Sequence, residues 1–471
     1  MIFADLLFLY VFLPLLLIAC LAARYIDSRR QGMGVQNAVL IFFSLLFYAW
    51  GEPVFILLLL LSVVVTWALA KKGACRVGIV YHLVMLVVFK YGNLLFGPLL
   101  TMAAPGSALS IHLPIGISFY TFQSISYLAD VRSCRCEAQP KLSRLLLYIT
   151  MFPQLIAGPI VRYQEIEKMM EERTVTDSDI AEGISRIIRG LAKKVILADQ
   201  LSEIVTHLIG EQLPGTTPQA VLGLVCFSMQ IYFDFSGYSD MAIGMGRCLG
   251  FTFPENFNAP YQCCSVTDFW RRWHMTLGRF FRDYVYIPLG GGRAGRPAVI
   301  RNILITWMLT GFWHGASWNF LLWGLYFGIL LLLERALWKD SHDRVPAHRA
   351  GRVLWRILTA VLVILGWGIF YFDDFGRMAG FFVVLFTGGI VASDLLFVSQ
   401  LTQNAFLLII GLVLCFVPTE RICALIRDKI AARLPFWCRG ILRGAAASAL
   451  LIIATLLLVG ATNHPFLYTR F

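Results

Sequence analysis

The sequence carries few charged residues. Asp, Glu, Lys and Arg together make up 14% of the 471 residues, whereas 58% of the residues are hydrophobic. Ordinary soluble domains carry roughly a quarter charged residues, so this composition excludes a typical soluble enzyme. Apolar segments recur along nearly the whole chain, which predicts an all-α, polytopic membrane protein with a single membrane domain over residues 1–471.

Several motifs of soluble enzymes and metal sites are also missing. The sequence contains no HExxH, no GxSxG and no Walker P-loop, and its 11 cysteines form no CxxC pair. The nearest approaches, Cys134 with Cys136 and Cys263 with Cys264, lack the spacing of zinc ligands or of secreted disulfides. Residues 290–292, three glycines, are more typical of a turn than of a phosphate cradle. We therefore expect no bound metal and no bound cofactor.

The net charge of +12 comes from short basic clusters that lie between the apolar segments. The positive-inside rule places such clusters on cytoplasmic loops, which explains them better than nucleic-acid binding does. Residues 2–23 form an apolar run that is too long for a signal-peptide core and has Asp5 rather than a basic cluster before it. We expect this run to remain in the protein as the first membrane span.

About 20 consecutive apolar residues are enough for one membrane crossing. The clearest candidate spans are residues 2–23, 53–70, 77–98, 218–245, 353–372, 403–418 and 443–461. A shorter run at 37–49 has basic residues before it, and the span after it has basic residues at its end. This pattern favours a helical hairpin with residues 51–53 outside the cytoplasm, and it puts both chain ends on the non-cytoplasmic side.

Residues 162–200 are more charged, with apolar positions at helical spacing. This segment is predicted to be either an amphipathic helix on the membrane surface or an ordinary helix in a cytoplasmic loop. From residue 268 to 301 seven arginines alternate with aromatic residues. Arg271 and Arg282 in this stretch are candidates for binding lipid headgroups or the phosphates of a nucleotide-bearing donor, with simple anchoring at the interface as the alternative.

Two histidines lie between residues 268 and 334. His274 belongs to the arginine-rich stretch, whereas His314 lies within an apolar run at residues 303–333 that has basic residues on both flanks. The flanks indicate that the chain enters and returns on one side, with a break near residues 311–315. An ionisable group within the membrane is costly, and it marks a functional site unless it only bonds a neighbouring helix. Imidazole could take up and return the proton of a reacting hydroxyl.

A second group of polar residues interrupts the apolar span at residues 230–240. Asp234 and Tyr238 are one helical turn apart, and Asp240 follows. We expect these side chains to face protein or a water-filled cavity, where they could orient a histidine or bind a substrate hydroxyl. They could equally serve only to satisfy nearby backbone and tyrosine donors.

Six long blocks of the sequence resemble the membrane-bound O-acyltransferase family, in the bacterial branch typified by alginate O-acetyltransferase. The blocks are PQLIAGPIVRY (153–163), YFDFSGYSDMAIG (232–244), FPENFNAPY (253–261), DFWRRWH (268–274), FRDYVYIPLGG (281–291) and GFWHGASWNFLLWG (311–324). The blocks lie between about residues 110 and 330, and the ending PFLYTRF is also familial. Several long blocks together are far more specific than any single short motif.

The resemblance implies about 10–12 transmembrane or re-entrant helices that form a ring around a central funnel. It matches His314 to the invariant family histidine and His274 to a second conserved polar position. Trp313 and Asn319, in the same block as His314, would then line the funnel. It further implies acetyl-CoA as cytoplasmic donor, a polysaccharide acceptor, an extracytoplasmic partner of the SGNH-hydrolase type, and residence in a bacterial cytoplasmic membrane.

Three other functions remain open at this point. Related family members transfer D-alanine to teichoic acid or acetyl groups to peptidoglycan. A transporter or a flippase for lipid-linked glycans would also use broken helices and membrane-buried polar residues. The sequence contains no inverted repeat, which disfavours a transporter.

Overall fold

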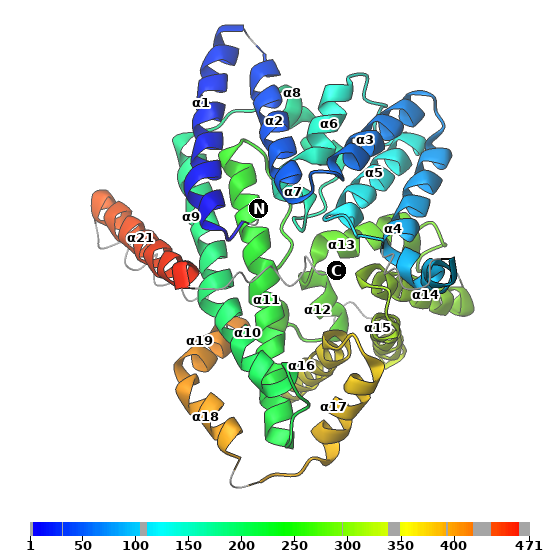
Figure 1. Cartoon of the computed structure of the whole chain (residues 1–471), viewed down its shortest axis with the longest axis vertical. Coiled ribbons are helices and arrows are strands. Elements are labelled where there is room, and N and C mark those ends of the chain that lie inside the picture. Colours follow the sequence, from blue (N-terminus) through cyan, green and yellow to red (C-terminus); the bar gives the residue numbers. More distant parts are fainter. Residues whose placement is uncertain are drawn as a thin grey trace. The chain divides into compact units, whose positions relative to one another are not determined.

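The computed structural model describes residues 3–30, 32–103, 111–293, 295–337, 349–391, 394–417 and 435–460. Among these residues every regular element is a helix, as Figure 1 shows. The helices of the first half are η1 (Phe8–Phe12), α1 (Leu13–Arg30), α2 (Gly34–Gly51), α3 (Ile56–Lys71), α4 (Cys75–Ala103), α5 (Ile117–Arg132), α6 (Leu142–Thr150), α7 (Phe152–Leu155), α8 (Tyr163–Glu171), α9 (Asp177–Ala192), η2 (Lys193–Ala198), α10 (Asp199–Val205), η3 (Thr206–Gly210) and α11 (Thr217–Cys248).

The helices of the second half are η4 (Pro260–Gln262), α12 (Val266–Arg272), α13 (Met275–Phe281), η5 (Arg282–Tyr286), α14 (Arg296–His314), α15 (Trp318–Leu337), α16 (Arg349–Tyr371), α17 (Phe375–Thr387), α18 (Leu395–Gln403), α19 (Ala405–Phe416) and α21 (Phe436–Gly460). They include α12 and α13, which flank His274, and α14 and α15, which flank the break after His314. The prediction of an all-α protein is confirmed. The PFLYTRF ending lies outside the described residues.

Seven helices of the described chain are long and apolar enough to cross a membrane. An eighth crossing is added if α18 and α19, which bend by 69° at Asn404, form one broken span. Two shorter apolar helices, α3 and α17, accompany them. The protein is therefore a multi-pass membrane protein, as predicted, whereas the ring of helices around a funnel stays a prediction.

The bounds of the first spans differ from those expected from hydropathy. The first span runs from Phe8 to Arg30 rather than over residues 2–23. Asp5 accepts a hydrogen bond from the backbone N–H of Leu7 at 3.1 Å at the start of this helix. The helix then continues through its basic end because Arg is a good helix former. The run at 37–49 extends to an 18-residue helix that ends at Gly51, and residues 52–55 form the turn that leads to α3.

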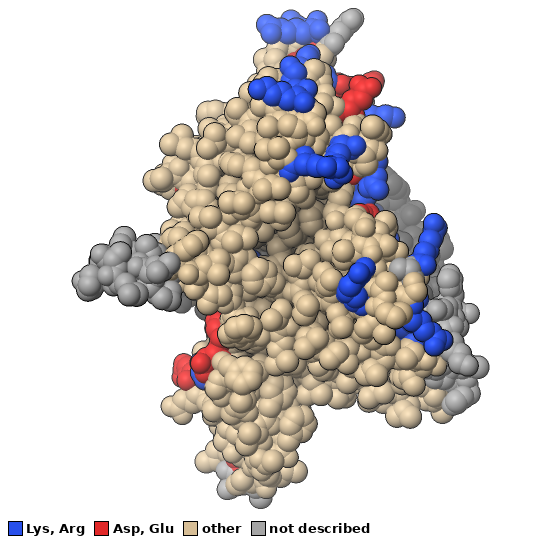
Figure 2. All heavy atoms as spheres, turned by 90° about the vertical axis from the view of Figure 1, so that its right-hand side faces the viewer, with Lys and Arg blue, Asp and Glu red and all other residues tan. Residues whose placement is uncertain are grey.

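Large apolar side chains are exposed on the outer faces of several helices, among them Ile18 on α1, Leu57 on α3 and Leu354 on α16. Figure 2 shows Lys and Arg in small clusters on a surface that is otherwise mostly uncharged. A soluble monomer rarely exposes so much contiguous apolar surface. These faces suit contact with lipid.

The described chain divides into two compact units. Unit 1 holds the described residues up to 187 and residues 238–255, and aromatic rings fill its core. The ring centroid of Phe3 lies 5.6 Å from that of Phe47 and 4.6 Å from that of Tyr238. In the same unit α9 and α11 approach closely at Gly183 and Gly244. A methyl group on either glycine would come within 2.7 Å of the carbonyl oxygen of the other.

Unit 2 holds residues 188–237 and the described residues between 256 and 460. Its core contains α14 and α15, which form a helical hairpin, together with α12 and α16. Five large aromatic rings pack between these helices, namely Trp270, Trp307, Trp323, Phe327 and Trp367. Since α9 and α11 each contribute residues to both units, the assignment of residues 1–471 to one membrane domain stays a prediction.

Candidate functional site

His314 is the last residue of α14, at the tip of the α14–α15 hairpin. The chain is extended at Gly315 and resumes as α15 at Trp318. The predicted break near residues 311–315 is therefore confirmed. The imidazole is 2% exposed, and its centroid lies 5.1 Å from the rings of Trp323 and Phe370.

Glycines allow the two helices of the hairpin to approach each other. A methyl group on Gly311 would come within 2.2 Å of the carbonyl oxygen of Phe320, and one on Gly324 within 2.3 Å of the carbonyl oxygen of Trp307. A methyl group on Gly315 would collide with the ring of Phe320 at 2.3 Å. Small residues at these positions are required because larger ones would separate the helices that hold His314.

Asn319 and Ser317 attach the hairpin tip to the end of α16. The buried amide of Asn319 donates hydrogen bonds to the carbonyl oxygens of Phe372 and, at 3.4 Å, of Ile369. The hydroxyl of Ser317 donates to the carbonyl oxygen of Asp373 at 2.9 Å. Asn319 thus satisfies carbonyl groups at the C-terminal end of a neighbouring helix, which is a structural contribution to the site.

His274 joins α12 to α13 and has a left-handed backbone conformation, with φ of 43°. Its Nδ1 lies 3.0 Å from Oδ1 of Asn256. Its ring packs in a T-shaped arrangement with that of Phe235, with the ring centroids 4.6 Å apart. Burial lowers the pKa of His274 to about 3, so its imidazole is neutral at physiological pH. The ring centroid of Trp313 is 6.2 Å from that of His274 and 4.8 Å from that of His314. The structure therefore places the rings of both predicted histidines next to one indole.

A buried glutamate supports α12, the helix that leads to His274. Glu334 of α15 accepts hydrogen bonds from the backbone N–H groups of Val266 and Thr267 at 2.5 and 2.9 Å. It also accepts one from the Thr267 hydroxyl at 2.7 Å. A carboxylate at a helix N-terminus satisfies backbone donors and interacts favourably with the helix dipole.

Asp234 contributes to a buried ion-pair cluster. Nζ of Lys194 lies 2.7 Å from Oδ1 of Asp234 and 2.8 Å from Oδ1 of Asp199. Burial alone would lower the pKa of Lys194, but the two carboxylates outweigh it and raise that pKa. The cluster joins the segment after α9 to the middle of α11.

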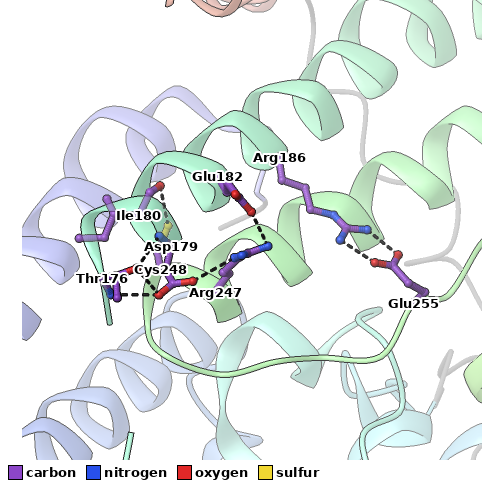
Figure 3. Close-up of polar contacts among 8 residues, drawn as sticks. All are labelled: Thr176, Asp179, Ile180, Glu182, Arg186, Arg247, Cys248 and Glu255. Carbon is purple, nitrogen blue, oxygen red and sulfur yellow. Dashed lines mark hydrogen bonds and ion pairs between the residues drawn. The ribbon is translucent and has the colours of Figure 1, made fainter. Parts of the chain in front are cut away.

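The other two polar residues of the 230–240 stretch belong to unit 1. Tyr238 is buried, with its ring stacked on Phe3. Asp240 accepts a hydrogen bond from Nε of Arg186 at 2.9 Å. Figure 3 shows that the same guanidinium binds both carboxylate oxygens of Glu255. Burial opposes the charge of Arg186, but the two carboxylates raise its pKa. Asp240 therefore links α11 to α9.

Arg271 and Arg282 have exposed side chains at the surface of unit 2. Nε of Arg282 pairs with the neighbouring Asp283 at 2.7 Å. Their exposure is compatible with binding an anionic ligand. Within the described residues, no cluster of three His, Cys, Asp or Glu side chains could hold a metal ion.

Two residues that organise this site, Asn256 and Glu334, were not identified from the sequence. Asn256 lies in the FPENFNAPY block, and Glu334 is the acidic residue that ends the apolar run after His314. The sequence shows where these two polar residues stand, but it does not show their partners, which lie 18 and 68 residues away along the chain. Only the folded chain brings each pair together.

Comparison with known proteins agrees with this architecture. The family model of the membrane-bound O-acyltransferases matches residues 88–370. The chain is 40% identical to the probable alginate O-acetylase AlgI of Pseudomonas aeruginosa, over 79% of this chain and 72% of that protein. It is 33% identical to the peptidoglycan O-acetyltransferase of Helicobacter pylori, over 77% and 76% of the two chains. It is 32% identical to the teichoic acid D-alanyltransferase of Bacillus subtilis, over 54% and 68%. The chain therefore belongs to the membrane-bound O-acyltransferase family and is a multi-pass O-acyltransferase.

Proposed function

We propose that this protein takes an acetyl group from cytoplasmic acetyl-CoA and passes it across the membrane for O-acetylation of an extracytoplasmic polysaccharide such as alginate. The observation that carries the proposal is the position of His314. This imidazole lies at the break of a helical hairpin, buried among aromatic rings and next to Trp313, whose indole also neighbours His274. The similarity to probable alginate O-acetylases supports acetyl transfer in particular.

In the proposed reaction His314 acts as general base toward the accepting hydroxyl. The hydroxyl oxygen attacks the carbonyl carbon of the acetyl thioester, and its proton passes to the imidazole. The C–S bond then breaks, and the imidazolium returns the proton to the leaving thiolate. His314 ends α14, so the partial negative charge of the last carbonyl groups of that helix stabilises the imidazolium while it exists. His274 would assist this transfer or position the donor.

The polar ends of the donor and acceptor need separate surfaces. We assign the phosphates of coenzyme A to the arginine-rich stretch that includes Arg271 and Arg282, because a guanidinium binds phosphate through two parallel hydrogen bonds. The acceptor would arrive from the opposite side of the membrane. An extracytoplasmic partner of the SGNH-hydrolase type would receive the acetyl group and complete its transfer to the sugar.

Substitution of His314 tests the proposal. His314→Ala should lower transfer from radiolabelled acetyl-CoA by at least about 10²-fold, because general base catalysis typically contributes that much. The exposed His207 of η3 provides a matched control, and His207→Ala should retain the wild-type rate. Both variants should reach the same abundance in the membrane. A fully active His314→Ala protein would contradict the proposed role.

Transfer of D-alanine is the second candidate, because the teichoic acid D-alanyltransferase of Bacillus subtilis is a relative. That reaction would need a cytoplasmic surface for a D-alanyl carrier protein instead of a site for coenzyme A. Parallel assays with acetyl-CoA and with a D-alanyl carrier protein separate the two candidates. Label from acetyl-CoA alone in the product supports the acetyltransferase.

A further inference from the structure

The segment that contains Asn256 runs alongside the loop that contains His274. The backbone N–H of Asn258 donates to the carbonyl oxygen of Arg272 at 2.9 Å, and that of Met275 donates to the carbonyl oxygen of Asn256 at 3.0 Å. These two bonds lie before and after His274 in the chain. His274 itself has a left-handed backbone conformation, which is strained for a residue other than glycine. The backbone of Asn256 therefore holds the loop in the conformation that presents this imidazole.

The side chain of Asn256 reaches the same loop. Its Oδ1 lies 3.3 Å from the backbone N of Thr276, 2.9 Å from the Thr276 hydroxyl and 3.0 Å from Nδ1 of His274. The side chain is completely buried. A backbone N–H can only donate, so the Asn256 atom that it meets is the amide oxygen and not the amide nitrogen.

This identification fixes the protonation of the imidazole. An amide oxygen accepts hydrogen bonds and cannot donate one, so Nδ1 of His274 carries the hydrogen. In a neutral imidazole only one nitrogen carries a hydrogen, and Nε2 then holds the lone pair. The rings of Phe235 and Trp313 pack against the imidazole and restrict its rotation away from Asn256.

We propose that Asn256 is a positioning residue that holds Nδ1 of His274 as the protonated nitrogen and thereby keeps Nε2 as its proton-accepting nitrogen. The role of Nε2 in the reaction rests on the proposed acyl transfer, whereas the tautomer itself does not. Asn256 acts through His274. Because it fixes the tautomer, the imidazole does not populate the unproductive form that carries its hydrogen on Nε2.

Three variants separate this role from general support of the loop. Asn256→Leu has a similar volume and removes the acceptor. Asn256→Asp keeps acceptor oxygens and adds a negative charge. Thr276→Val is the matched control, since it removes a hydrogen bond to the same oxygen but leaves the bond to Nδ1 of His274 in place.

The first measurement is the ¹⁵N spectrum of the full-length protein in detergent with labelled histidine side chains. The signals of His274 are those that His274→Gln removes. Wild type, Thr276→Val and Asn256→Asp should show Nδ1–H, and Asn256→Leu should lose this preference. An unchanged tautomer in Asn256→Leu, or the same loss in Thr276→Val, would overturn the proposal.

The second measurement is acetyl transfer from acetyl-CoA as a function of pH. Asn256→Leu should lower kcat by about 10²-fold while KM for the donor stays within about threefold, since the change affects proton transfer and not binding. Asn256→Asp should restore much of kcat and bring an acid limb to higher pH, because a carboxylate beside Nδ1 raises the pKa of the imidazole. Equal kcat in Asn256→Leu and wild type would contradict a role in the reaction. If wild type transfers no acyl group while the spectra behave as expected, the proposed function fails and the positioning by Asn256 stands.

Discussion

The indole of Trp313 lies edge-on to the imidazole of His274, with ring centroids 6.2 Å apart and an interplanar angle of 63°. The ring centroid of the same indole lies 4.8 Å from that of His314, the next residue in the chain. Trp313 is 4% exposed, and a change of its ring would alter the packing around both imidazoles. Trp313 is therefore a neighbour that the two histidines share.

Truncation of this shared neighbour should damage catalysis more than folding. We expect Trp313→Ala to lower kcat/KM by about 10²-fold, because misplacement of a catalytic group by about 1 Å has an effect of that size. Trp313→Phe keeps a ring at the position and should lose less. Trp318 is 74% exposed at the start of α15 and supplies the control. Equal activity in Trp313→Ala and Trp318→Ala would show that the packing of Trp313 against the histidines is unimportant.

The close approach of α14 and α15 gives a second prediction. Gly324→Ala should destabilise the hairpin by about 1–3 kcal/mol, because the added methyl group meets backbone that cannot move aside cheaply. The thermal midpoint in detergent and the transfer rate should both fall. A methyl group on Gly440 of α21 would meet no atom within 4 Å, so Gly440→Ala should match wild type in both measurements. An unaltered midpoint in Gly324→Ala would mean that the helices are not so closely packed.

The break at His314 could be predicted from the sequence because its determinants are local. An apolar run of 31 residues between two basic flanks is too long for one crossing, and the glycines and polar residues that interrupt it are adjacent in the chain. The first span was placed less well, since hydropathy does not register that α1 continues as a helix through its basic end.

Tertiary partners account for the features that the sequence did not reveal. Asp234 and Asp240 were recognised as polar residues within an apolar span, but Lys194 and Arg186, their partners, lie 40 and 54 residues earlier in the chain. A pattern of residue types carries no information on such pairings. For the same reason the acceptor function of Asn256 could not be read from its block.

Glu334 supports a third prediction. Glu334→Leu leaves the backbone N–H groups of Val266 and Thr267 without their acceptor, which should release the start of α12 and misalign His274. We expect a lower transfer rate and faster amide hydrogen exchange in α12. Glu334→Gln retains one acceptor oxygen and should lie between Leu and wild type. Glu211→Gln, at an exposed position after η3, is the control. Unchanged exchange in Glu334→Leu would rule out this support.

The ion-pair cluster around Lys194 gives a prediction for stability. Lys194→Met leaves the carboxylates of Asp234 and Asp199 buried without this cation, and loss of one partner from a buried pair costs about 3–5 kcal/mol. The thermal midpoint in detergent should fall accordingly. Adding Asp234→Asn removes one of the two charges and should recover part of the loss. Lys193→Met changes the adjacent lysine and should have a smaller effect.

The pH dependence of this stability follows from the raised pKa of Lys194. A lysine whose pKa is higher in the folded state stabilises the fold fully below its unfolded value of about 10.4. That contribution is lost as the pH rises through the folded pKa. The midpoint difference between wild type and Lys194→Met should therefore stay constant between neutral pH and about pH 9 and decrease only above the unfolded pKa. A difference that decreases already between pH 7 and pH 9 would mean that the lysine loses its proton within the folded protein and that the cluster is not held by this charge.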